Sequence, residues 1–83
     1  MTSVKVNLSS ASGVDSIDRV KAFVDIISNF DGEYDLASDR YLVDAKSIMG
    51  VFSLNTGKDL RLDIHNDDEA AEAKKALAAY IID

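Results

Sequence analysis

The sequence predicts an α+β fold in two layers, with a four-stranded sheet covered by helices on one face. Two kinds of pattern support this prediction. Apolar residues alternate with polar ones in four short stretches, as they do in half-buried strands. Between and after these stretches, apolar residues recur at helical spacing. The resulting order is β-α-β-β-α-β-α, in which every helix can cover the same face of the sheet. With 83 residues, we expect one domain spanning residues 1–83.

The four predicted strands are defined by alternation and by the turns between them. The residues expected to point inward are, strand by strand, Val4, Val6 and Leu8; Tyr34 and Leu36; Tyr41, Val43 and Ala45; and Leu60, Leu62 and Ile64. The polar stretch 38–40 predicts a turn that makes the second and third strands a hairpin. The stretch 55–58 predicts the turn before the fourth strand.

Two helices follow from helical spacing and from the residues that begin them. The first is predicted from about Ser16 to Asn29, with Asp15 or Ser16 as N-cap. Its inner positions are expected at Val20, Phe23, Val24, Ile27 and Phe30. The last helix is expected to be capped and charged at its start by Asp67, Asp68 and Glu69, where the helix dipole favours negative charge. Its inner stripe is expected to be Ala70, Ala73, Leu77, Tyr80 and Ile81.

A third, short helix is predicted within 46–54, with Ser47 as N-cap. At 100° per residue, one side of this helix carries Gly50, Val51 and Leu54, and the other carries Ile48, Met49 and Phe52. A chain of this size cannot bury both sides, so the second set predicts a partner-binding surface beside Ser47. We expect Met49 and Phe52 to be exposed, whereas Ile48 could equally pack against the first helix.

Composition excludes several classes of function. The formal net charge of −6 and the absence of a basic cluster argue against nucleic acid or an anionic membrane as partner. The chain has no cysteine and no apolar run long enough to span a bilayer, which is compatible with the cytoplasm. No nucleophile–base pair or ligand cluster can be assembled from these residues, so we expect neither an enzyme nor a cofactor or metal site.

His65 is the single histidine of the chain. It could be a phosphoryl acceptor, or a metal ligand together with Asp67 and Asp68. A lone histidine without a second histidine or a cysteine makes a poor metal site. We therefore expect an exposed residue at the end of the fourth strand.

The run Lys46-Ser47-Ile48-Met49-Gly50-Val51-Phe52-Ser53-Leu54 resembles the regulatory-serine segment of HPr, the histidine-containing phosphocarrier of the sugar phosphotransferase system (PTS). The resemblance extends over nearly the whole chain, including the order of the elements. It implies an HPr-like open-faced β-sandwich: a four-stranded antiparallel sheet with three helices on one face. It also implies a cytoplasmic, monomeric protein.

The chain departs from the family in the loop after the first strand. HPr carries Gly-Ile/Leu-His-Ala-Arg-Pro-Ala there, and the histidine takes the phosphoryl group. This chain reads Gly13-Val14-Asp15-Ser16-Ile17-Asp18-Arg19-Val20, so either Asp15 or Ser16 stands in the place of the histidine, with Arg19 close by. Neither side chain offers the imidazole nitrogen that phosphoryl relay requires. The loop is therefore a degenerate phosphocarrier loop.

The resemblance implies a regulatory role. It is to the catabolite-repression HPr type, which lacks the histidine and keeps the serine. In HPr of the low-GC Gram-positive bacteria the serine that matches Ser47 is phosphorylated by HPr kinase/phosphorylase. The resemblance therefore implies that the product docks on a catabolite-control-type transcription regulator or another PTS protein. We expect Ile48, Met49 and Phe52 to supply the apolar part of that interface.

Two alternatives stay open at this point. Residues 13–18 also resemble the Asp-Ser-Leu motif of acyl carrier proteins, which would make Ser16 the site of a phosphopantetheine arm. The strand-like alternation in 34–45 and 60–64 disfavours the four-helix bundle of that family. The other alternative is an interaction module that carries no modification and uses the same apolar surface.

Overall fold

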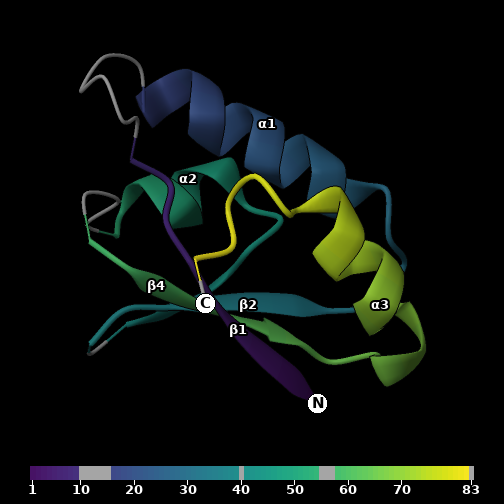
Figure 1. Ribbon diagram of the computed structural model, residues 1–83. Coiled ribbons are helices and arrows are strands. Elements are labelled where there is room, and N and C mark those ends of the chain that lie inside the picture. Colours follow the sequence, from purple (N-terminus) through teal and green to yellow (C-terminus); the bar gives the residue numbers. More distant parts are fainter. Residues whose placement is uncertain (10–15, 40, 55–57, 83) are drawn as a thin grey trace.

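The computed structural model describes residues 1–9, 16–39, 41–54 and 58–82, and its elements follow the predicted order. Their bounds are β1 Thr2–Val6, α1 Ser16–Ser28, β2 Tyr34–Ala37, β3 Leu42–Asp44, α2 Ile48–Phe52, β4 Leu60–Ile64 and α3 Asp67–Ala76. The three helices lie on the same side of the sheet (Figure 1). The predicted two-layer α+β architecture is confirmed.

The sheet has the strand order β1-β4-β2-β3, and all its neighbours are antiparallel. β4 is therefore a central strand although it is the last in sequence. In its middle, Leu62 lies opposite Val4 of β1 and Leu36 of β2. β3 forms one edge of the sheet. The other edge, β1, is partly covered by the C-terminal segment, because Ile81 forms a bridge with Val6.

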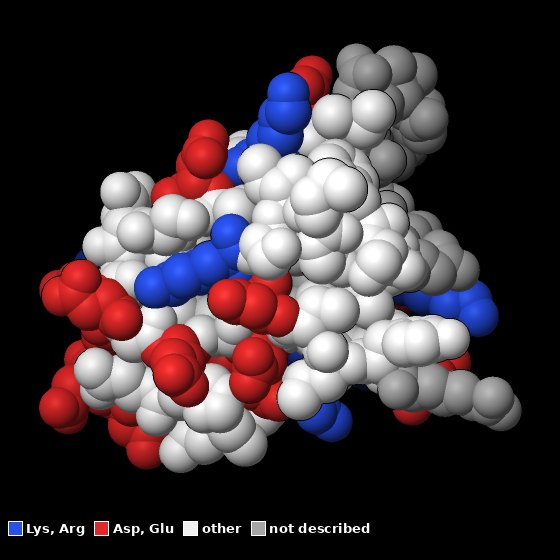
Figure 2. All heavy atoms as spheres, turned by 180° about the vertical axis from the view of Figure 1, so that it is seen from behind, with Lys and Arg blue, Asp and Glu red and all other residues white. Residues whose placement is uncertain are grey.

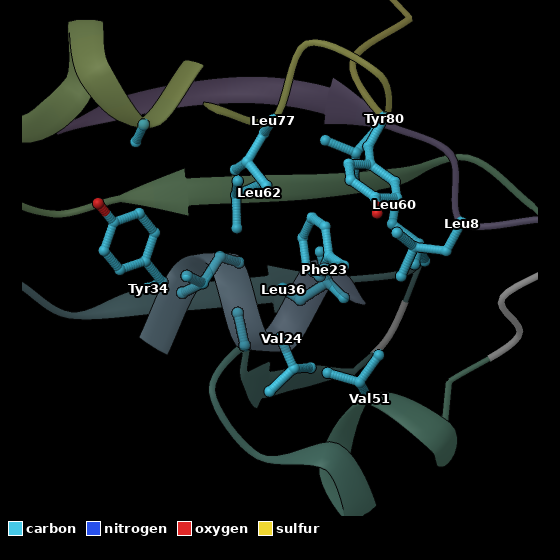
Figure 3. Close-up of a cluster of buried hydrophobic side chains, with 14 of the residues drawn as sticks. Leu8, Phe23, Val24, Tyr34, Leu36, Val51, Leu60, Leu62, Leu77 and Tyr80 are labelled. Carbon is cyan, nitrogen blue, oxygen red and sulfur yellow. The ribbon is translucent and has the colours of Figure 1, made fainter. Parts of the chain in front are cut away.

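The core fills the space between the sheet and the helices, as Figure 3 shows. The predicted inward residues of β2 and β4 are all buried, and so is every predicted inner residue of the first helix except the half-buried Phe30. Tyr80 meets Phe23 edge-on, with ring centroids 5.5 Å apart. Val51 of α2 points toward Val24 of α1 in the close-up, so α2 completes the core beside α1.

The predictions for the last helix need two corrections. Its N-cap is Asn66, whose side chain accepts a hydrogen bond from the backbone N–H of Asp68, so the acidic residues follow the cap rather than form it. The helix also ends earlier than expected, at Ala76 with Leu77 as C-cap. The backbone N–H of Tyr80 donates to the carbonyl oxygen of Leu77, which closes a turn and frees Ile81 to pair with β1.

The third strand is shorter than predicted at both ends, since it runs from Leu42 to Asp44 instead of from Tyr41 to Ala45. The carbonyl oxygen of Tyr41 accepts a hydrogen bond from Ser38 N–H and closes the hairpin turn. The side chain of Tyr41, which was predicted to point inward, is 66% exposed. Among the described helices, none has the length and apolar character needed to cross a bilayer.

Candidate functional site

Ser47 caps α2 as its sequence predicts. Its backbone is extended, and its Oγ accepts a hydrogen bond from the backbone N–H of Gly50 at 3.1 Å. Its own carbonyl oxygen accepts from Val51 N–H at 2.9 Å, which begins the helix. Capping of this kind satisfies an N–H that the helix itself leaves without a partner. The cap therefore holds the Ser47 hydroxyl in one orientation, half-buried at the start of α2.

Gly50 brings α2 into close contact with the sheet. A Cβ atom at this position would lie 3.3 Å from both Ser47 Oγ and Val43 Cβ, which is tighter than most carbon contacts. A side chain larger than that of glycine would therefore push α2 away from β3 at this position. Because α2 is pressed against β3 here, the position of the Ser47 cap is fixed by packing as well as by hydrogen bonding.

The two sides of α2 differ in burial. Val51 and Leu54 belong to the core, as predicted. Met49 is 81% exposed and Phe52 is 39% exposed, so the expected exposure of both is found. Ile48 is half-buried and packs against the core. The exposed apolar surface of α2 thus consists of Met49 and Phe52, with Ile48 at its inner border.

Charge is distributed unevenly around this surface. Figure 2 shows acidic side chains gathered on the side of the molecule that carries α3. The first turn of α3 contains three acidic residues. Right of centre in that view, on the side that carries α2, lies a broad area without charged side chains. The lysine nearest to α2 in sequence is Lys46. Its ammonium group donates a hydrogen bond to the carbonyl oxygen of Phe30 at 2.6 Å, and its Nζ lies 5.7 Å from the centroid of the Tyr34 ring.

The degenerate phosphocarrier loop is described in part. Asp15 lies outside the described residues, and Ser16 is the first residue of α1. The Arg19 guanidinium donates to the carbonyl oxygens of Asn7 at 3.2 Å and Ala79 at 3.5 Å. It also lies 4.7 Å from the ring centroid of Tyr80. Arg19 thus ties the start of α1 to the end of β1 and to the turn after α3.

His65 lies far from the end of β1 along the sheet. The antiparallel register places Ile64 opposite Thr2, and Leu60 opposite Val6, where β1 ends. A strand of five residues spans roughly 17 Å. His65 follows Ile64, so it lies at the other end of the sheet from Val6. The predicted exposure of His65 is confirmed, with its side chain 38% exposed.

His65 has a partner that no local sequence pattern predicts. Its Nε2 lies 2.6 Å from Asp35 Oδ2, on the sheet face away from the helices. Period-two alternation does place both residues on that face, but their proximity depends on how β2 pairs with β4. No group of three or more histidine, cysteine, aspartate or glutamate side chains within the described ranges could hold a metal ion.

A second polar cluster on the same face surrounds Asp63. Ser3 Oγ donates to Asp63 Oδ1 at 2.7 Å, and Arg61 donates to both carboxylate oxygens at 2.9 and 3.1 Å. Burial opposes the charged form of Asp63. The hydrogen bonds from Ser3 and Arg61 and the charges of Arg61 and His65 outweigh this effect and hold the pKa of Asp63 below its ordinary value. These contacts are intramolecular and leave the carboxylate fully partnered.

Comparisons with known proteins agree with this architecture. A family model described as the PTS HPr component phosphorylation site matches residues 3–83. HPr-C-His from Thermoanaerobacter tengcongensis has a similar structure, with a TM-score of 0.75 and 32% sequence identity, covering 95% of this chain and 89% of that one. A phosphocarrier protein HPr from Bacillus anthracis str. Ames is similar with a TM-score of 0.71 and 32% identity, covering 98% and 96% of the two chains. A comparison with curated proteins finds no match.

The family match covers more than nine-tenths of the chain, and the sheet order and helix placement are those of its structural relatives. The four-stranded sheet also rules out the helical bundle of acyl carrier proteins, so modification of Ser16 by a phosphopantetheine arm has no support. The chain belongs to the HPr family of the sugar phosphotransferase system.

Proposed function

We propose that this chain is a regulatory HPr-family protein, switched by phosphorylation of Ser47, and that it does not relay phosphoryl groups through a histidine. Regulation would act through docking at the exposed apolar surface of α2. The observation that carries the proposal is the combination of a fixed, capped Ser47 with exposed Met49 and Phe52 next to it.

The absence of relay rests on His65. It is the single histidine of the chain, and a phosphoryl relay needs an imidazole that donor and acceptor proteins can both reach. His65 lies at the other end of the sheet from Val6, the last residue of β1, and beside Asp35. Its Nε2 lies 2.6 Å from Asp35 Oδ2, so this ring nitrogen is already engaged in a hydrogen bond. Since His65 is the single histidine, the chain has no imidazole at Asp15 or Ser16, the positions that match the relay histidine of the family.

The modification is a simple group transfer. Ser47 Oγ would attack the γ-phosphorus of ATP, the bond to the β-phosphate oxygen would break, and ADP would leave. The hydroxyl proton would pass to a base of the kinase. After transfer, the bridging Oγ can still accept the hydrogen bond from Gly50 N–H, so α2 keeps its cap.

Phosphorylation would change the surface more than the fold. A phosphoserine adds roughly −1.5 to −2 charge and three strong acceptor oxygens. Lys46 is already engaged with Phe30, so the phosphate oxygens would remain available to a partner's arginine. Met49 and Phe52 would supply the apolar contacts of the same interface.

The partners that fit this proposal are an HPr kinase/phosphorylase and a catabolite-control-type transcription regulator or another PTS protein, all in the cytoplasm. HPr-family proteins act with other PTS proteins. The kinase would need access to Ser47, and the regulator would read the phosphate together with the α2 surface.

The direct test is the intact mass of the protein after two incubations, one with ATP and an HPr kinase and one with phosphoenolpyruvate and the general PTS enzyme I. We expect one phosphate from the kinase and none from enzyme I. The variant S47A should take no phosphate. S53A is the matched control, because Ser53 is an exposed serine at the other end of α2. Kinase-dependent phosphate on S47A would contradict the assignment.

A second candidate function uses the same surface without the modification. The exposure of Met49 and Phe52 favours a constitutive interaction module as well. The kinase arm separates the two candidates, provided that a histidine-containing HPr is phosphorylated in parallel. If that HPr takes phosphate and this chain takes none, constitutive docking is the better description.

A further inference from the structure

β3 is an edge strand of the sheet and pairs with β2 on one side only. On its other side, backbone N–H and C=O groups point away from β2. Two bonded pairs flank the strand, each closed by an N–H···O bond of 2.9 Å: Ser38 with Tyr41, and Tyr34 with Ala45. In an antiparallel ladder such pairs recur at every second residue. Leu42 and Asp44 fall between them, so both direct their backbone N–H and C=O away from the sheet.

These outward groups are largely unused in the described part of the chain. The carbonyl oxygen of Asp44 accepts from Ser47 N–H at 3.0 Å. The N–H of Asp44 and both backbone groups of Leu42 have no backbone partner among residues 1–9, 16–39, 41–54 and 58–82. An edge with free donors and acceptors is a template on which a further strand can pair.

The side chains at this edge continue two rows that cross the sheet on its helix-free face. One row runs Ser3, Asp63, Asp35 and ends at Asp44. The neighbouring row runs Lys5, Arg61, Ala37 and ends at Leu42. At the edge, the first row is therefore acidic and the second is apolar.

Both end residues are accessible. Leu42 is 61% exposed, and Asp44 is also exposed. Tyr41, just before the strand, is 66% exposed and lines an open hollow of about 320 Å³ together with Ser53 and Leu54. Two large exposed apolar residues in succession on a sheet edge mark an interaction surface rather than a protected edge.

We propose that the outer edge of β3 binds an extended segment of another protein, which adds an antiparallel strand to the sheet. The segment carries Lys or Arg opposite Asp44 and an apolar residue opposite Leu42, in the order basic-x-apolar along its chain. Strand addition supplies backbone hydrogen bonds for affinity, and the alternate side chains supply specificity.

Charge complementarity selects this occupant. Cross-strand pairs of opposite charge are favourable, and like charges directly opposite each other are unfavourable. Asp44 has Asp35 as its inner neighbour in the row, so the edge position calls for a cation on its outer side. Two copies of this chain, each with a formal net charge of −6, would repel one another. A basic segment of a different protein suits the edge better.

The test uses two synthetic heptapeptides, Ser-Thr-Lys-Thr-Val-Thr-Ser and the same sequence with Glu in place of Lys, titrated into the intact protein and followed by NMR. We expect the Lys peptide to slow hydrogen exchange of the Leu42 and Asp44 amides. We expect the Glu peptide to bind roughly two- to fivefold more weakly, the range of an exposed charge pair.

The variant D44N provides the decisive comparison. Asn keeps an acceptor for the bond that Asp44 Oδ1 receives from Lys46 N–H, while the charge is lost. D44N should abolish the preference for the Lys peptide. D25N removes one carboxylate from the exposed side of α1 and should leave the preference unchanged.

Three results would overturn the proposal: no slowing of either amide at saturating Lys peptide, a preference that survives in D44N, or protection that rises with protein concentration in the absence of peptide. The last result would make a second copy the occupant. None of these measurements requires phosphate on Ser47, so the proposal stands or falls separately from the proposed function.

Discussion

The hydroxyl of Tyr34 donates a hydrogen bond to Glu69 Oε1 at 3.0 Å, which joins β2 to α3 across the edge of the core. Both carboxylate oxygens of Glu69 also accept from the backbone N–H of Gly32, at 3.1 Å each. Burial of the tyrosine, its hydrogen bond to Glu69 and the negative charge of Glu69 raise the pKa of Tyr34 well above its ordinary value. One side chain of α3 thus fixes the turn that leads from α1 into the sheet.

Replacing Glu69 with alanine should lower the free energy of unfolding by about 1.5–3 kcal/mol, the range for hydrogen bonds to a charged group. The loss arises because the Tyr34 hydroxyl and the Gly32 N–H both lose their acceptor. Urea denaturation measures it. E72A is the matched control, because Glu72 is exposed on the same helix and should change stability by less than about 0.5 kcal/mol. Equal effects of the two variants would show that the Glu69 contacts add nothing.

Replacing Gly32 with alanine should disturb the same contacts from the other side. A Cβ atom there would lie 2.8 Å from Glu69 Oε1 and 2.9 Å from Asn66 Cβ, too close for either to stay in place. We expect G32A to cost about 1–3 kcal/mol in urea denaturation. In the double variant G32A/E69A the two losses should fall short of additive, because both act on the Glu69 contacts. If the two losses of unfolding free energy were strictly additive, the cost of G32A would not arise from the Glu69 contacts.

The sequence predicted the layers and element order because burial is periodic in each element. Val4, Leu36 and Leu62 all point inward as alternation requires, and their pairing follows from the antiparallel register. The sequence did not predict the Glu69 contacts. Glu69 and Tyr34 are 35 residues apart in sequence, so their contact depends on how α3 packs beside β2. Local patterns also missed the end of α3, where the bridge between Ile81 and Val6 takes precedence over helical continuation.

Acid should weaken the protein through Asp63. Its folded-state pKa is lower than in the unfolded chain, so the unfolded state binds more protons and stability falls as the pH drops below about 4. The contribution is fully present at neutral pH. D63N should lower stability at pH 7 and flatten this part of the profile, as measured by urea denaturation between pH 3 and 7. An unchanged acid dependence in D63N would assign it to other carboxylates.

The two sides of α2 should respond differently to truncation. V51A removes a fully buried side chain and should cost about 2 kcal/mol in urea denaturation. M49A truncates a side chain that is 81% exposed and should stay within about 0.5 kcal/mol of the parent protein. If Ser47 is phosphorylated as proposed, the same M49A variant should weaken docking of the phosphorylated protein to the proposed regulator. A large loss of stability in M49A would mean that Met49 belongs to the core.

The candidate site was predictable where it depended on one short segment. The cap by Ser47 and the exposure of Met49 both follow from 46–54, because a five-residue helix has one side to bury and one to expose. The pairing of His65 with Asp35 was not predictable, since it required the register between β2 and β4.

The most direct measurement is the intact mass of the protein after incubation with ATP and an HPr kinase, with S47A and S53A in parallel and a histidine-containing HPr as positive control. We predict a single added phosphate on the parent protein and on S53A, and none on S47A. A phosphate on S47A, or none on the parent protein while the control HPr is phosphorylated, would contradict a regulatory switch at Ser47.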